Sequence, residues 1–167
     1  MSQPLFSSFS PGLPSARTIR RRLSSPATVY SCLLEQIGHF HRLLYAGAVL
    51  PAAARQFVIL RSKSALQLSL GWEFHFRRAL EAGLDPALIE QAKNQERIVE
   101  QPYGLLSDAV QNILAMEPLP EAIQEGLISY FTAQGMSEII LLTGLERLLA
   151  QAIHATDEPL SEEAPPW

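Results

Sequence analysis

Apolar residues recur at spacings of three and four along most of this chain, and this pattern is the strongest constraint on its fold. The first such stripe consists of Val29, Leu33, Ile37, Phe40 and Leu44. These positions share one face of an α-helix, which turns once every ~3.6 residues. No segment alternates apolar and polar residues for long enough to predict a strand. The sequence therefore predicts an all-α fold, a compact bundle of six to seven helices.

Glycine and proline positions predict where individual helices begin and end. Gly83 follows an expected helix over 72–82 and is a typical C-terminal stop. Asp85 and Pro86 then provide an N-cap residue and a first-turn proline for a short helix. The last helix, from about Met136, is apolar almost all round, which predicts burial at the bundle centre or at a subunit interface.

The ends of the chain differ from its middle, which predicts three parts. Residues 1–26 form an irregular N-terminal arm, 27–156 a helical domain, and 157–167 a flexible acidic and proline-rich tail. The arm is rich in Ser, Pro and Arg and lacks acids, so a transit peptide or a segment packed on a neighbouring subunit are further interpretations.

Composition excludes several functional classes. The formal net charge of −4 provides no basic excess for nucleic acid. The one cysteine, Cys32, can form neither an intramolecular disulfide nor a CxxC pair, and it is expected to be a buried core thiol. No apolar run reaches the ~18 residues of a membrane helix, and no secretory signal is present, so we expect a cytoplasmic protein with neither a nucleic-acid nor a membrane partner.

The candidate catalytic and binding residues concentrate between Ile59 and Gly83. An Ile59-Leu60-Arg61 stretch is followed by Trp72, eleven residues after Arg61, and by His75, eight residues before Gly83. In these spacings the chain resembles the carboxymuconolactone decarboxylase family, which includes the alkyl hydroperoxidase D-like proteins. The resemblance spans roughly residues 26–155.

The chain departs from that family at several motif positions. The two cysteine positions of the peroxidase branch fall on Leu68 and Gly71, and Gly71 also takes the place of a motif Glu. The first His of the family's His-His pair falls on Phe74, and a Glu upstream falls on Gln56. The chain is thus a divergent member without the CxxC pair that disulfide-cycling peroxidase chemistry needs.

The resemblance implies a cofactor-independent lyase that acts on a small carboxylated or lactone/carbonyl substrate. In this interpretation His75 is the catalytic acid/base, and Arg61, Trp72 and Phe74 bind the substrate. The family also implies a homo-oligomer, a trimer or hexamer. No cofactor is expected.

Helical geometry refines this interpretation. Trp72 and His75 share one face, whereas Glu73 lies about 200° from His75 and is expected to pair with Arg77 in solvent. The same arithmetic separates His39 from His41 on their helix. Because the sequence offers no other His, Cys or Asp group at metal-ligand spacing, it predicts no metal.

Each of these residues also has a structural interpretation. His75 could be a hydrogen-bonded core histidine, Trp72 a core residue and Arg61 a structural ion-pair partner. Asp108 and Glu138 are expected to be helix-surface or N-terminal charges.

The sequence leaves two alternative functions open. One is a non-catalytic oligomeric binding or assembly protein on the same scaffold, and the other is a hydroperoxide reductase that uses Cys32. A closed pocket that joins His75, Arg61 and a third polar group would favour the enzyme.

Overall fold

The computed structural model describes residues 26–154, with side chains from residue 35 onward. Over this range the chain is helical with no strand, as the apolar spacing predicts. The described helices are α2 (Pro26–Ala46), α3 (Ala52–Ala65), α4 (Trp72–Glu81), α5 (Pro86–Lys93), α6 (Tyr103–Ala115) and α7 (Glu121–His154).

The chain divides into two units, one ending at Phe40 and the other beginning at His41. The first unit therefore contains most of α2, and the second contains its last turn and a half together with α3 to α7. The predicted arm and tail, and the side chain of Cys32, lie outside the part of the chain that the structure describes. No described helix is long and apolar enough to span a membrane.

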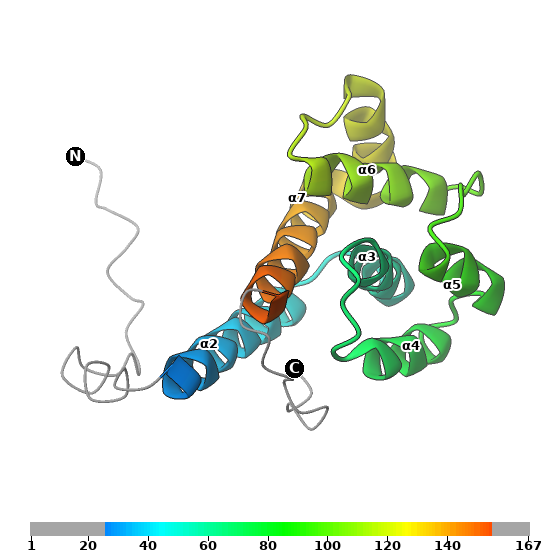
Figure 1. Ribbon diagram of the computed structural model, residues 1–167. Helices are drawn as coiled ribbons and strands as arrows, with labels where there is room; N and C mark the ends of the chain where they lie inside the picture. Colours follow the sequence, from blue (N-terminus) through cyan, green and yellow to red (C-terminus); the bar gives the residue numbers. More distant parts are fainter. Residues whose placement is uncertain (1–25, 155–167) are drawn as a thin grey trace, which may run out of the picture. The chain divides into compact units, whose positions relative to one another are not determined.

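Helix α3 is the central element of the second unit. It contacts α4, α5, α6 and α7, and Figure 1 shows it nearly end-on with these helices around it. Every residue from Gln56 to Lys63 is buried, so this helix is covered on all faces. Its polar residues must therefore find partners inside the protein, because an unpaired buried polar group is costly.

The local end signals read from the sequence are confirmed. Gly83 has φ +80° just beyond α4, and the Asp85 carboxylate accepts a hydrogen bond from the Ala87 N–H at 2.8 Å. Pro86 occupies the first turn of α5. Gly71, at the start of α4, also has a left-handed φ of +70°.

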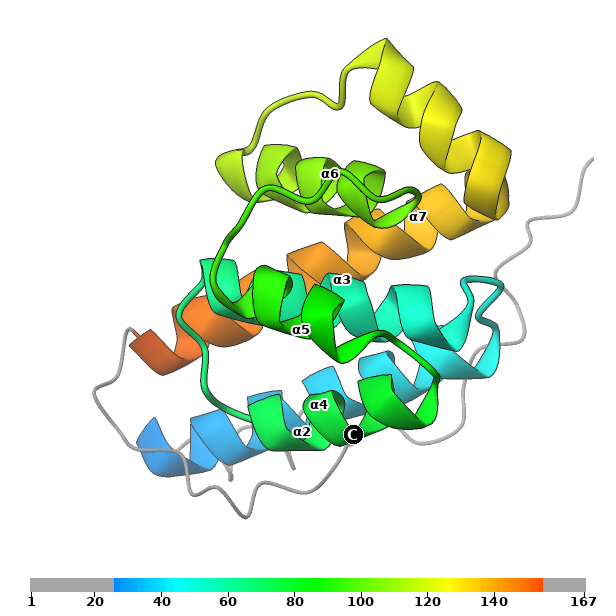
Figure 2. The ribbon, with the colours of Figure 1, turned by 90° about the vertical axis from the view of Figure 1, so that its right-hand side faces the viewer.

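Helix α7 begins at Glu121, well before Met136, where the sequence predicts the last helix to start. Thr132 has φ +67° and ψ +169°, which breaks the helical path, and Figure 2 shows the bend between the yellow and orange parts of α7. After the bend, a Cβ at Gly135 would lie 2.8 Å from Phe131 Cβ. The tight turn at the bend therefore requires glycine at this position.

The part of α7 that follows the bend at Thr132 is buried on one side only. Ile139, Leu142 and Leu149 face the core, whereas Leu141 and Leu148 are each 45% exposed in the described chain. Contacts within the described chain thus do not bury this helix on most sides, contrary to the expectation for the bundle centre.

The expectation of Glu138 as a surface charge is wrong. Its side chain is buried, and its two carboxylate oxygens accept hydrogen bonds from Val49 N–H at 2.7 Å and Leu50 N–H at 3.0 Å. These amides precede α3, so a carboxylate from α7 fixes the start of the central helix. Asp108 is exposed, as predicted.

Candidate active site

Four helices place polar side chains together in the interior of the second unit. We call this set the polar cluster. It comprises His41 and Tyr45 of α2, Gln56 and Lys63 of α3, His75 of α4, and Glu146 of α7. Tyr45 is half-buried and the other five side chains are buried. Such a concentration of buried polar groups is expensive to fold, which makes it the strongest candidate for a functional site.

Helix α3 supplies the centre of the cluster through its periodicity. Gln56 and Lys63 are seven residues apart, so they lie within about 20° of each other around the helix. This face of α3 carries an amide and an ammonium, at the two ends of the buried stretch.

His75 is held by a hydrogen bond to Gln56. Its Nδ1 lies 3.0 Å from Gln56 Oε1, and Gln56 Nε2 donates to Tyr45 Oη at 3.1 Å. With the amide in this orientation Oε1 is an acceptor, so the proton of a neutral His75 ring resides on Nδ1. The lone pair of Nε2 is then free for chemistry.

Both buried imidazoles are neutral at physiological pH. Burial, followed by the charge of Lys63, lowers the pKa of His75 to about 2, with smaller effects from His41 and Arg78. Burial, then Lys63, lowers the pKa of His41 to about 4, with smaller effects from two arginines, Arg55 and Arg42. Neutral imidazoles can accept a proton or donate a lone pair.

The only ion pair with both partners buried in the described chain joins Lys63 to Glu146. Lys63 Nζ lies 2.8 Å from Glu146 Oε2, and both side chains are 2% exposed. The ammonium also donates to the Leu70 carbonyl at 2.9 Å. Burial raises the pKa of the Glu146 carboxyl, and the Lys63 ammonium opposes that rise. The contact with Glu146 is an ion pair without hydrogen-bond geometry, since Oε2 has no hydrogen-bond partner in the described chain. Because an ammonium has three N–H donors, the bond to Leu70 leaves donor capacity for another acceptor.

His41 contributes a buried nitrogen without a hydrogen-bond partner. Its ring centroid lies 4.5 Å from that of Tyr45 and 6.1 Å from that of His75. Its Nε2 is buried and no protein atom bonds to it. A buried polar atom in this state costs about 1–3 kcal/mol, so the cluster retains unused hydrogen-bonding capacity.

Three cluster residues could together hold a metal ion. Single ligand atoms of His41, His75 and Glu146 all lie within 4.8 Å of one another. The sequence predicts no metal because residue spacing reveals only ligands that share one helix. These three residues lie on three different helices, α2, α4 and α7. Lys63 already neutralises the carboxylate, so a divalent ion would add a large uncompensated charge to a buried site.

Gly71 forms an exposed edge of the polar cluster. A Cβ at this position would lie 3.8 Å from His75 Cδ2 and 3.9 Å from Lys63 Nζ, and it would meet no other heavy atom within 4 Å apart from its chain neighbours. Gly71 itself is exposed. A side chain at this position would therefore contact two buried residues of the cluster.

The structure does not bring Arg61 to His75. Arg61 lies five residues after Gln56 on α3, which turns it about 140° away from the cluster. Its Nη1 donates to the carbonyl of Ala92 on α5 at 3.3 Å. Burial lowers the pKa of Arg61, and Asp108 opposes this effect. The cation beside His75 is Lys63 instead.

Trp72 and Phe74 precede His75 on α4, and both are half-buried. Trp72 packs against the hydrophobic core. The Phe74 ring contacts the His75 ring edge-on at 5.2 Å between centroids, and the Arg78 guanidinium lies 5.3 Å from the Phe74 centroid. The expected Glu73–Arg77 pair is present in solvent, with 3.8 Å between Nε and Oε1 of the pair.

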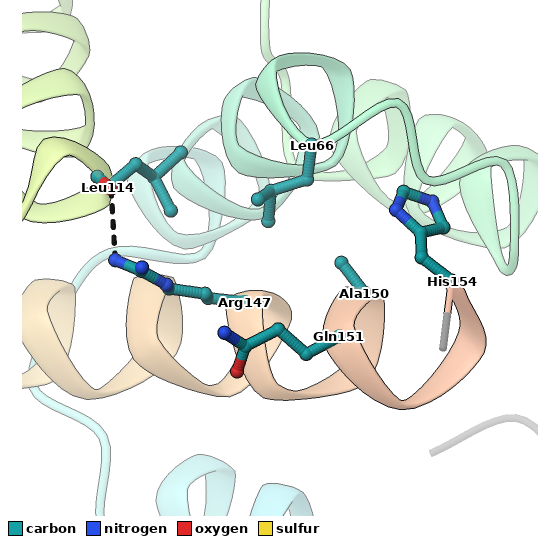
Figure 3. Close-up of a pocket in the computed structure, with 6 residues that line it drawn as sticks. All are labelled: Leu66, Leu114, Arg147, Ala150, Gln151 and His154. Carbon is teal, nitrogen blue, oxygen red and sulfur yellow. Dashed lines mark hydrogen bonds between the residues drawn. The ribbon is translucent and has the colours of Figure 1, made fainter. Parts of the chain in front are cut away.

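A groove of about 620 Å³ opens between the C-terminal ends of α3 and α7. Figure 3 shows its lining, with Arg147 Nη1 donating to the Leu114 carbonyl at 2.9 Å and His154 at the far end. Two further lining residues are Leu66, which follows the last residue of α3, and Ala150 of α7.

Of the polar cluster, the sequence predicts only His75 as a site residue, and most of the side chains around His75 are not predicted. The family comparison pointed to Gln56 as the position of a motif Glu, and the seven-residue spacing could have added Lys63. No local pattern indicates Glu146 or His41, because their contacts with His75 and Lys63 depend on how α2 and α7 pack.

Comparisons with protein-family models, with curated proteins and with solved structures find no match to this chain. Its function must therefore be inferred from the polar cluster and from the residues that surround it.

Proposed function

We propose that this chain is a cofactor-independent lyase of carboxymuconolactone decarboxylase type, acting on a small carboxylated or lactone/carbonyl substrate. The observation that carries the proposal is the buried contact set of His75, in which Gln56 fixes Nδ1 and Lys63 supplies a nearby positive charge. Groups with strongly perturbed pKa values that converge in this way are typical of catalytic sites.

The proposed reaction needs a proton donor and a stabilised oxyanion. As the bond to the carboxylate carbon breaks, CO₂ leaves and the electron pair moves onto an adjacent carbonyl oxygen. The free N–H of Lys63 stabilises this oxygen. The carbon then takes a proton from Nε2 of His75, which must first take one up from water. A bound anion that offsets the charge of Lys63 raises the pKa of His75 and favours this uptake.

The variant His75→Asn tests this role. It removes the titrating ring, and a lost general acid/base typically costs ~10²–10⁴-fold in rate. The assay is CO₂ release from a panel of small lactone acids and β-keto acids, with His39→Asn as the control because His39 is exposed and lies outside the polar cluster. Turnover by His75→Asn at the rate of the control would refute the proposal. Absence of turnover by the unmodified protein across the panel would also count against it.

A second candidate is a non-catalytic oligomeric binding or assembly protein. Two observations favour it: His75 is only 1% exposed, and α7 leaves apolar side chains at Leu141 and Leu148 uncovered in the described chain. A trimer or hexamer that covers this face is the assembly expected in either case, and we propose that the protein acts in the cytoplasm. Hydroperoxide reduction would depend on Cys32, whose side chain lies outside the described residues.

A further inference from the structure

The groove between the C-terminal ends of α3 and α7 combines an apolar lining with a cation. Its volume is about 620 Å³, and Figure 3 shows the side chains that border it. None of these residues is acidic: they are Leu66, Leu114, Arg147, Ala150, Gln151 and His154. A groove with this lining is complementary to a partner that carries both apolar and acidic side chains.

Arg147 is the charged group of the groove, and most of its donors are unused. The side chain is half-buried, and its Nη1 donates to the Leu114 carbonyl at 2.9 Å. A guanidinium has five N–H donors in all. The two ion pairs among the described residues do not include Arg147. Within the described part of the chain, this guanidinium therefore lacks a carboxylate to bind.

The segment that follows α7 has the complementary chemistry. Residues 155–167 lie outside the described residues and begin directly after His154, which itself lines the groove. The segment contains no base, and its acids form one pair before Leu160 and one pair after it: Asp157, Glu158, Glu162 and Glu163. It thus offers an apolar side chain between two acidic pairs.

This segment is long enough to reach the whole groove. Arg147 precedes His154 by seven residues, which is ~10 Å of helix at 1.5 Å per residue. The six residues from His154 to Leu160 span up to ~20 Å when extended. A short tether also gives the segment an effective concentration on the order of millimolar at the groove. Weak contacts are therefore sufficient for docking.

We infer that residues 155–163 turn back along α7 and occupy this groove. In this position Leu160 packs against Leu66, and the acidic pair after Leu160 reaches Arg147. The direction follows from the anchor, because a chain that runs back from His154 meets Arg147 last. The apolar lining is then removed from water, and the guanidinium gains a carboxylate partner. This inference is independent of the proposed lyase activity, which belongs to the polar cluster.

The chain provides a matched control for this inference. Leu66 lines the groove, whereas its neighbour Ala65 is exposed and is not a lining residue. The two positions are adjacent, so they are about equally far from the anchor of the segment. Because Leu66 is half-buried, an undocked segment would meet a thiol at position 65 at least as often as one at position 66.

The experiment measures disulfide formation in the full chain with Cys32→Ser. One variant carries Leu66→Cys and Leu160→Cys, and the control carries Ala65→Cys and Leu160→Cys. Under the same oxidised glutathione, we expect the Leu66 variant to form the intramolecular disulfide about tenfold faster. Added Arg147→Gln should slow this reaction about two- to fivefold, as expected for one exposed ion pair, and leave the control rate unchanged.

Equal rates for the two cysteine pairs, or a Leu66 rate indifferent to Arg147→Gln, would overturn the inference. Disulfides between chains in place of those within one chain would also overturn it, since the groove would then hold the segment of a second copy. Circular dichroism melts of the reduced variants check that each one folds. Should Leu66→Cys not fold, Gln151→Cys, at an exposed lining position, takes its place with the same expected dependence on Arg147.

Discussion

Acidification should destabilise this protein through its two buried histidines. In the folded chain the pKa of His75 is lowered to about 2 and that of His41 to about 4, both from 6.5. A group with a lowered folded-state pKa binds more protons when unfolded, so stability is lost as the pH falls below 6.5. The free energy of unfolding stops falling only once the pH is below the folded-state pKa values of both rings.

The magnitude follows from linkage. At about pH 4.5 each unfolded histidine is almost fully protonated, whereas the folded rings remain largely neutral. Each ring then costs about 2 pH units at ~1.4 kcal/mol per unit, or ~5 kcal/mol for both as an upper value. Since the two rings contact each other and share the charge of Lys63, we expect roughly 2–5 kcal/mol. Glu146 opposes this loss of stability, because burial raises its folded-state pKa and the folded chain therefore binds its proton more readily than the unfolded chain does.

The assay is urea unfolding followed by circular dichroism at about pH 7 and about pH 4.5. The double variant His41→Asn/His75→Asn should lose most of the extra destabilisation at the lower pH, because its unfolded state has two fewer groups to protonate. Each single variant should lose about half. The control is His39→Asn, at an exposed position. A double variant with the same pH dependence as the unmodified protein would show that these rings are not neutral in the folded state.

Three further predictions concern other parts of the molecule. Glu138→Gln should lower the free energy of unfolding by about 1–3 kcal/mol, because one of the two backbone N–H groups that it binds loses its acceptor oxygen. Glu121→Gln, at an exposed position, should change that free energy by less than ~0.5 kcal/mol in the same denaturation assay. The protein should sediment as an oligomer at micromolar concentration, and Leu141→Glu/Leu148→Glu should dissociate it; a monomeric unmodified protein would remove the interface. Added Zn²⁺ should leave the melting temperature nearly unchanged, because the cluster carboxylate is already paired; stoichiometric binding that needs both buried imidazoles would make the cluster a metal centre.

The sequence by itself determined the helices and their local contacts. The apolar spacing gave the all-α class, Asp85 and Gly83 marked helix ends, and Glu73 and Arg77 were paired correctly. These features depend on residues within four positions of one another along the chain. Their geometry is set by the helix itself, whatever surrounds it.

Only the tertiary structure decided which polar residues share a site. Glu138 was expected on the surface yet fixes the start of α3, and Arg61 was expected beside His75 yet faces α5. Lys63 meets Glu146, far away in the sequence, because α3 is enclosed on all sides and its buried charge must find a partner from another helix. Helical periodicity gives the face on which a residue lies, but the packing of the helices decides what that face meets.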